Sequence, residues 1–292
     1  MTPLTPMTPT SREQRAILVI GIGAGDPDHL TLQAVKAMSR ADVFFVVGKG
    51  REKESLTDLR HTMIEEHARG PYRVVRVADP SRDRRPMDHG AYRSAVQDWR
   101  DRRADLFERL LREEMGPGET GAFLVWGDPS LYDSTLGILS AVESRGSVSA
   151  TIEVIPGITS VSTLAARHRI PLNRVGEPVR ITPARRLPDL GRGDDGDHGD
   201  IVVMLDAHAS FTQVEGDDIW IYWGAYLGTP DELLIAGPLR EVSDRIRAVR
   251  ADARARHGWI MDTYLLRSME TPDGPRTPTA PGENDGPDGP AA

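Results

Sequence analysis

The chain has 292 residues, enough for two domains that each bury a hydrophobic core. Its 36 basic and 44 acidic side chains give a net charge of −8, which argues against nucleic acid as the main partner. It contains no cysteine, which excludes a disulfide scaffold, a thiolate metal site, an iron–sulfur cluster and a cysteine nucleophile.

The sequence carries no signal for export or for insertion into a membrane. No apolar run approaches the ~18 residues that span a bilayer. The N-terminus lacks the basic start and apolar stretch of a signal peptide, so we expect a cytoplasmic protein with no membrane partner. Residues 1–14 and 270–292 offer few large apolar side chains, and we predict that they are disordered tails.

The first structured stretch, residues 16–50, has the pattern of a strand, a loop, a helix and a second strand. Its continuous apolar runs are typical of buried parallel strands, the second of them at 43–47. Thr31 is expected to cap a helix that buries Leu32, Val35 and Met38. This unit favours an α/β domain.

The alternation continues along the chain and then pauses near Pro171. The stretch 50–112 is rich in charge and is expected to be an insertion with a short strand at 72–78 and a long helix at 92–115. We predict further strands at 122–127 and 151–157, helices at 131–144 and 158–168, and strands that return at 201–205 and 219–224. We therefore expect an N-terminal α/β domain at 15–172 and a C-terminal α/β domain at 173–269.

The first glycine loop, GIGAGD, does not fit a dinucleotide site. Asp26 takes the place of the third glycine of that fingerprint, where its carboxylate would meet a pyrophosphate. The second strand ends in Gly48 and Lys49 instead of the acidic residue that binds a ribose. No Ser or Thr follows Lys49, so a phosphate-binding P-loop is also excluded.

Two further loops follow predicted buried strands. WGDPSLYDST repeats the Gly-Asp-Pro sequence of the first loop, and IPGITS offers the hydroxyls of Thr159 and Ser160 at a helix start. Because ligands of α/β domains bind at the carboxyl ends of parallel strands, the three loops together predict a binding site at that edge. An anionic side chain there suits a ligand with hydroxyls or positive charge better than a bare phosphate.

The segments GIGAGDPDHLT, WGDPSLYDST and EVIPGITSVSTLAA resemble, in order and approximate spacing, the signature segments of the tetrapyrrole methylases. The resemblance runs roughly from Ile17 to Leu266. It implies a two-domain α/β fold with S-adenosylmethionine in the cleft between the domains, and a homodimer. By resemblance, the cofactor-binding residues are Ala24, Trp126, Gly127, Asp128, Thr159, Ser160, Met204, Leu205, Tyr226, Leu227, Ala236 and Gly237.

The resemblance also implies a reaction in corrin-ring synthesis. VVGKG, MLDAH and IYWGAYLGTPDELLIAGPL are similar to the members that methylate carbon 1 of precorrin-5 and release its extruded acetyl group as acetate. Methyl transfer needs no nucleophile on the protein, whereas attack of water on the acetyl carbonyl would be helped by a base. Asp26 and Tyr132 are the catalytic candidates, and His29 and Asp133 are weaker ones.

Basic residues are expected near the many carboxylates of the macrocycle. The candidates are Arg51, Arg82, Arg84, Arg85, Arg93, Arg185 and Arg186. No metal site is expected, because His61 and Glu65 lack the paired histidines of a zinc helix. The alternatives are a tetrapyrrole C-methyltransferase of the uroporphyrinogen III or precorrin-4 type, an enzyme of diphthamide formation, a ribosomal-RNA methylase, a non-catalytic tetrapyrrole carrier and a nicotinamide oxidoreductase.

Overall fold

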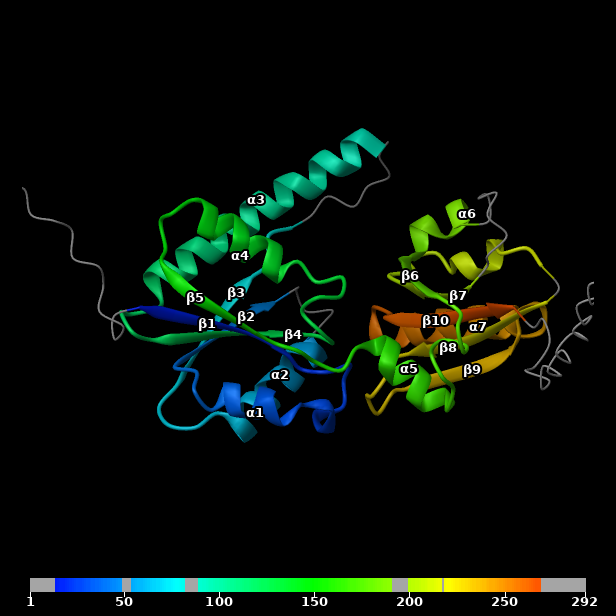
Figure 1. The fold of residues 1–292 in the computed structure, drawn as a ribbon, viewed down its shortest axis with the longest axis horizontal. Helices are drawn as coiled ribbons and strands as arrows, with labels where there is room; N and C mark the ends of the chain where they lie inside the picture. The colour runs from blue at the N-terminus through cyan, green and yellow to red at the C-terminus, as the bar shows by residue number, and fades with distance from the viewer. Residues whose placement is uncertain (1–13, 49–53, 82–88, 191–198, 217, 269–292) are drawn as a thin grey trace, which may run out of the picture.

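A computed structural model describes residues 14–48, 54–81, 89–190, 199–216 and 218–268 of the chain. These residues form two five-stranded sheets, each covered by helices, which lie side by side (Figure 1). The predicted tails lie outside the described residues except for Gln14. The α/β class and the two-domain architecture predicted from the sequence are confirmed.

The first sheet is entirely parallel, with the strand order β3-β2-β4-β1-β5. Its strands are β1 (Arg15–Gly21), β2 (Val43–Gly48), β3 (Arg73–Ala78), β4 (Thr120–Val125) and β5 (Ala150–Ile155). The central strands β1 and β4 are buried on both faces, as their continuous apolar runs predict. Their carboxyl ends point toward the second domain (Figure 1).

Helices cover both faces of this sheet. On one face lie α1 (Leu32–Met38) and α2 (Glu54–His67), and on the other lie α3 (His89–Glu113) and α4 (Thr135–Ser144). Thr31 caps α1 as predicted, since its Oγ1 accepts a hydrogen bond from Ala34 N at 3.0 Å. The predicted buried face of α1 is wrong in part: Leu32 is 80% exposed, because the helix buries Ala34, Ala37 and Met38 instead.

The charged stretch predicted as an insertion is an integral part of the first domain. It supplies the edge strand β3 and helices on both faces of the sheet, and Met63 and Ile64 of α2 are fully buried. Most of its described charges lie on the exposed faces of these helices, which is why the segment looks hydrophilic in sequence, whereas Arg103 is buried and pairs with Asp79 at 2.9 Å. Within the described ranges, no helix is long and apolar enough to span a membrane.

The second sheet is mixed, with the order β6-β7-β10-β8-β9. Its strands are β6 (Val179–Pro183), β7 (Asp200–Met204), β8 (Ile219–Ala225), β9 (Leu233–Pro238) and β10 (Asp262–Ser268). Only the β6–β7 pair is parallel. The helix α7 (Leu239–His257) covers one face, and α5 (Ser160–His168) packs through Val161 and Leu164 on the other. Short helical segments η3 (Ala184–Arg186), α6 (Leu187–Leu190) and η4 (Ser210–Gln213) complete this domain.

The chain passes from the first sheet to the second domain between β5 and α5. Although α5 precedes the boundary predicted near Leu172, its buried side chains pack with Val202 and Leu265 of the second sheet. The second domain therefore begins with α5, before the pause in the sequence pattern at Pro171. This arrangement puts the loop between Ile155 and Ser160 directly between the two domains.

Candidate active site

Three glycine loops meet at the carboxyl ends of the neighbouring strands β4, β1 and β5. Gly127 N donates a hydrogen bond to Gly23 O at 2.7 Å, so the first two loops pair through their backbones. A Cβ added to Gly157 would lie 2.1 Å from Gly127 O, and one added to Gly21 would lie 2.6 Å from Gly157 N. The glycines are therefore required because the three backbones pack against one another, and the loops form one continuous edge.

Asp128 ties two of these loops together. Its Oδ2 accepts a hydrogen bond from Gly157 N at 2.8 Å, and its Oδ1 accepts from Ser130 N at 2.8 Å and from the Ser130 hydroxyl. Burial raises the pKa of Asp128, but the hydrogen bonds from Ser130 and Gly157 outweigh it, and the pKa lies below its ordinary value. Both carboxylate oxygens are thus engaged in holding the edge.

Asp26 occupies the same Gly-Asp-Pro context in the first loop but is less engaged. Its Oδ1 accepts a hydrogen bond from Asp28 N at 2.9 Å, which caps the short helix η1 (Pro27–His29). Among the hydrogen bonds of the described residues, none reaches Asp26 Oδ2. His29 lies beside it, with its Nδ1 buried and without a hydrogen-bond partner. Both residues adjoin the second domain, since a Cβ on Gly228 would approach Asp26 N and His29 Cε1.

The second domain supplies the opposite wall. A Cβ on Gly25 would lie 2.6 Å from Thr229 Cγ2 and 2.8 Å from Leu227 O, so the first loop touches the turn after β8. Ser160 Oγ lies 3.2 Å from Thr263 Oγ1 on β10, and Tyr132 Oη donates to Ile181 O on β6 at 3.1 Å. The two domains therefore meet along the edge that carries the predicted site.

Three residues at this meeting edge hold left-handed backbone conformations that are unusual for non-glycine residues. Tyr132 follows β4 with φ 53°, Leu205 follows β7 with φ 58°, and Tyr226 follows β8 with φ 50°. Such conformations cost about 1–3 kcal/mol each and cluster at functional sites.

The predicted hydroxyl residues are already partly engaged. Thr159 Oγ1 accepts a hydrogen bond from Ser162 N at 3.1 Å and caps α5, while the Ser160 hydroxyl makes the contact with Thr263. Thr159 Oγ1 also lies 3.0 Å from Ser162 Oγ, and each hydroxyl oxygen keeps acceptor capacity for a second partner. Their main role in the structure is to start α5 and to join it to β10.

The remaining predicted contacts divide into two groups. Ala24 and Leu227 are buried, Trp126 and Met204 are half-buried, and Leu205 is 58% exposed; all lie at the ends of strands that face the other domain. The Tyr226 side chain packs against Trp259 and donates to Trp259 O, while its backbone N–H donates to Met261 O at 3.1 Å. Ala236 and Gly237 pair with Tyr222 and Ile221, about 10 Å along the sheet from the end of β8. The structure does not bring these two to the same edge.

The predicted basic residues are only partly described. Arg51, Arg82, Arg84 and Arg85 lie outside the described residues, as does the side chain of Arg93. Arg185 and Arg186 are exposed at the end of η3. Burial raises the pKa of Tyr132, and the charge of Arg185 partly opposes this rise. Sequence reasoning missed Arg60, which lies beside Trp126, because a single arginine in a charged helix gives no distinguishing signal.

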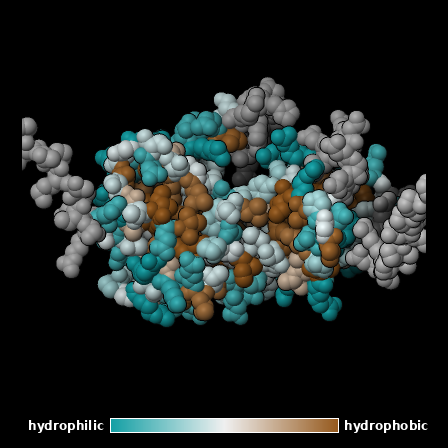
Figure 2. All heavy atoms as spheres, viewed as in Figure 1, coloured by the Kyte–Doolittle hydropathy of each residue, from teal (hydrophilic) through white to brown (hydrophobic). Residues whose placement is uncertain are grey.

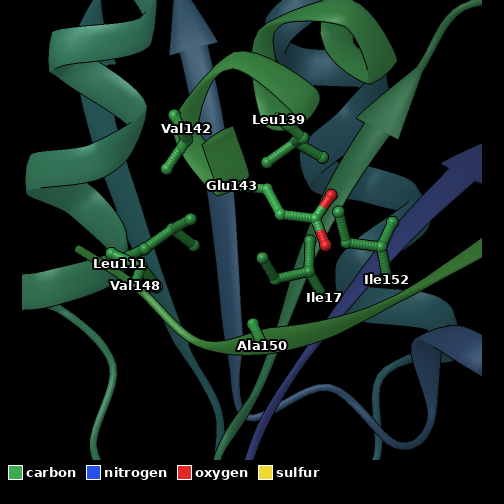
Figure 3. Close-up of a pocket in the computed structure, with 8 residues that line it drawn as sticks. All are labelled: Ile17, Leu111, Leu139, Val142, Glu143, Val148, Ala150 and Ile152. Atoms are coloured by element: carbon green, nitrogen blue, oxygen red, sulfur yellow. The ribbon is translucent and has the colours of Figure 1, made fainter. Parts of the chain in front are cut away.

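A small cavity lies elsewhere in the first domain. It has a volume of about 20 Å³ and lies between α3, α4, β5 and the amino-terminal half of β1, partly open to solvent (Figure 3). Its lining is apolar apart from Glu143, and it holds at most about one water. Because it is remote from the three loops, it is a packing gap near the β5 edge, where hydrophobic residues gather on the surface (Figure 2).

Known proteins resemble the chain along nearly its whole length. Residues 16–243 match the tetrapyrrole (corrin/porphyrin) methylases. Precorrin-6A synthase [deacetylating] of Sinorhizobium sp is 48% identical over 258 residues, covering 87% of this chain and 95% of the relative. Precorrin-2 C(20)-methyltransferase of Sinorhizobium sp is 28% identical, covering 60% and 67%.

Solved structures agree with these sequence matches. A cobalamin synthesis related protein, CobF, from Corynebacterium diphtheriae superposes with a TM-score of 0.75 and 37% identity, covering 88% of this chain and all of that one. The cobalt precorrin-4 methyltransferase CbiF shares the fold at 17% identity, with a TM-score of 0.55 and coverage of 89% and 97%. With its three interlocked loops and its match over more than half its length, the chain belongs to the tetrapyrrole (corrin/porphyrin) methylase family.

Proposed function

We propose that the chain is an S-adenosylmethionine-dependent C-methyltransferase of cobalamin biosynthesis that converts precorrin-5 to precorrin-6A. It methylates carbon 1 of the macrocycle and releases the extruded acetyl group as acetate. The observation that carries this proposal is the 48% identity to precorrin-6A synthase [deacetylating] over 95% of that protein. The homodimer and the cytoplasmic location stay predictions.

The site residues suit methyl transfer. S-adenosylmethionine supplies a methyl group bound to a sulfonium, and the protein has to hold that carbon in line with the acceptor. In this proposal the backbone of 22–26 and 126–128 holds the donor from the first domain, and 204–205 and 226–228 hold it from the second. The hydroxyls of Thr159 and Ser160 are the proposed polar contacts at the start of α5.

Release of the acetyl group needs a water molecule, which supplies one oxygen of the acetate. Asp26 is the proposed base that takes a proton from this water. Asp128 is unsuited to that role because both of its oxygens accept hydrogen bonds from the loops, whereas only one oxygen of Asp26 is used. The Tyr132 ring, 42% exposed beside the domain contact, is the proposed surface for the macrocycle.

The test is an anaerobic incubation of the purified protein with S-adenosylmethionine and enzymatically prepared precorrin-5, analysed by mass spectrometry. We expect a product that has gained one methyl group and lost the acetyl group, with acetate and S-adenosylhomocysteine released in equal amounts. Precorrin-5 left unchanged by a protein that binds S-adenosylhomocysteine would refute the substrate and keep the methylase fold. Binding of a macrocycle without any S-adenosylhomocysteine formed would indicate a carrier instead.

A further inference from the structure

The side chain of Arg60 lies at the carboxyl end of β4, beside the candidate site. Its Nε donates a hydrogen bond to Leu124 O at 3.3 Å, and its guanidinium carbon lies 5.2 Å from the centre of the Trp126 ring. Trp126 is the residue that precedes Gly127 and Asp128 in the second loop. Arg60 therefore places a positive charge in contact with the second glycine loop of the candidate site.

The sheet opens at this point. β2 and β4 pair only from Val43 to Phe45 with Gly121 to Phe123, so the last residues of β4 have no partner in β2. The chain leaves β2 for α2 on one face of the sheet and leaves β4 for α4 on the opposite face (Figure 1). In open α/β sheets, ligands bind in the crevice that forms where connections depart to opposite faces. Arg60 occupies that crevice and binds the carbonyl that β2 leaves unpaired.

Within the described ranges, Arg60 has no counter-charge in direct contact. Among the residues that the structure describes, no carboxylate lies within ion-pair distance of it. Burial lowers the pKa of Arg60 to about 10, and the more distant charge of Asp133 offsets this only in part. A largely enclosed guanidinium without a counter-charge is unfavourable unless an anion completes it. Part of the side chain stays accessible to solvent, so an anion has a path to it.

A second unused donor lies on the same residue that Arg60 covers. Trp126 Nε1 is buried and has no hydrogen-bond partner. An indole N–H can only donate a hydrogen bond, so it needs an acceptor. A guanidinium also only donates, and its remaining N–H groups form a planar fork that matches the geometry of a carboxylate. The two groups thus call for the same kind of ligand.

We propose that Arg60 and Trp126 form a subsite at the opening between β2 and β4 that binds one carboxylate of the substrate. This inference rests on the proposed function, because the acetate and propionate side chains of a tetrapyrrole are the source of that carboxylate. The subsite orients the macrocycle from the first domain, whereas the cofactor lies across the edge of the three loops. Arg60 is thus a substrate-binding residue separate from the proposed cofactor contacts.

The test measures two affinities of the full-length protein. Uroporphyrin III, a stable porphyrin with carboxylate side chains, is titrated by fluorescence, and S-adenosylhomocysteine is titrated by calorimetry. We expect Arg60→Met to weaken uroporphyrin binding at least ten-fold and Arg60→Lys to weaken it three- to ten-fold, with unchanged affinity for S-adenosylhomocysteine. The matched control is Arg69→Met, which removes an exposed charge near the end of α2 that hydrogen-bonds only to carbonyls of its own segment.

Each result decides the inference. Wild-type uroporphyrin affinity in Arg60→Lys and Arg60→Met, or no binding by the wild-type protein, overturns the subsite. Parallel loss of both affinities and of the melting temperature, in Arg60→Lys as well as Arg60→Met, shows that Arg60 only supports the fold. Turnover of precorrin-5 by the wild-type protein tests the proposed function, and porphyrin affinity tests the subsite. If the wild type turns over precorrin-5 but the Arg60 variants bind porphyrin normally, only the subsite fails. If porphyrin binding depends on Arg60 but precorrin-5 is not turned over, only the proposed function fails.

Discussion

Two aspartates in the same Gly-Asp-Pro sequence have different roles because their surroundings differ. Asp128 accepts hydrogen bonds with both carboxylate oxygens, one from the third loop, while Asp26 accepts one bond from its own turn. A carboxylate that is fully hydrogen-bonded is stabilised in its charged form and is a poor base. The structural aspartate and the candidate base are therefore told apart by their partners and not by their motif.

Asp128→Asn tests the structural role. An amide presents a donor to the N–H of Ser130 or Gly157, so one buried donor loses its acceptor, and we expect a loss of about 1–3 kcal/mol of unfolding free energy at pH 7. The measurement is urea denaturation, with the exposed Asp28→Asn as control. Equal stability of Asp128→Asn and the wild type would contradict the role.

The same pair of proteins makes the pH dependence testable. Because the folded pKa of Asp128 lies below its unfolded value, its contribution is complete above about pH 4 and is lost as the pH falls through the folded pKa. The stability difference between wild type and Asp128→Asn should therefore shrink in acid.

At the scale of elements, α5 begins at the boundary between the domains. Its N-cap, Thr159, follows the third glycine loop, and its buried face packs on the second sheet. The helix thus connects the third glycine loop of the first domain to β10 of the second sheet, through the contact between Ser160 and Thr263. A cap at this point supports both the helix and the edge of the site.

Thr159→Ala should lower the unfolding free energy by about 1 kcal/mol, because the N–H of Ser162 loses its acceptor. Thr159→Ser keeps the oxygen and should restore most of that stability. Thermal or urea unfolding of the two variants provides the comparison. If Thr159→Ala were as stable as Thr159→Ser, the hydroxyl would not act as the cap.

At the scale of the whole molecule, the candidate cleft depends on how closely two sheets approach. The contact between Gly25 and the turn at 227–229 leaves no room for a side chain. A larger residue at this point has to move one domain relative to the other, since its Cβ would lie 2.8 Å from Leu227 O and 3.4 Å from Thr229 N, which are main-chain atoms of the second domain. Cofactor affinity should therefore respond to a substitution of Gly25, because this contact joins the two segments, 22–26 and 226–228, that are proposed to hold the cofactor.

Gly25→Ala should weaken binding of S-adenosylhomocysteine at least ten-fold, as measured by calorimetry, since its Cβ would meet Leu227 O and Thr229. The control is Gly137→Ala in α4, where a Cβ meets nothing within 4 Å. This substitution should raise stability by about 0.5–1 kcal/mol and leave the affinity unchanged. Wild-type affinity in Gly25→Ala would show that the domain contact does not govern the cleft.

Sequence patterns determined the elements of this protein and the edge at which its loops gather. Continuous apolar runs that end in glycine predicted β1, β2 and β4 and a parallel sheet, since strands buried on both faces carry their pattern locally. The same logic failed for the stretch 50–112, because its charged outer faces conceal the buried Met63 and Ile64. The helical pattern also failed for Leu32, because the face of α1 that carries Leu32 is about as apolar as the face with Ala34 and Ala37, which is the one buried.

Only the tertiary structure decided what each polar group does. The decisive contacts join residues far apart in the chain: Asp128 with Gly157, Tyr132 with Ile181, and Arg60 with Leu124. Periodicity records which face of an element is buried, but it holds no information about which distant donor meets which acceptor. The engaged Asp128, the less engaged Asp26 and the uncompensated Arg60 therefore become distinct only when the two sheets and their loops are assembled.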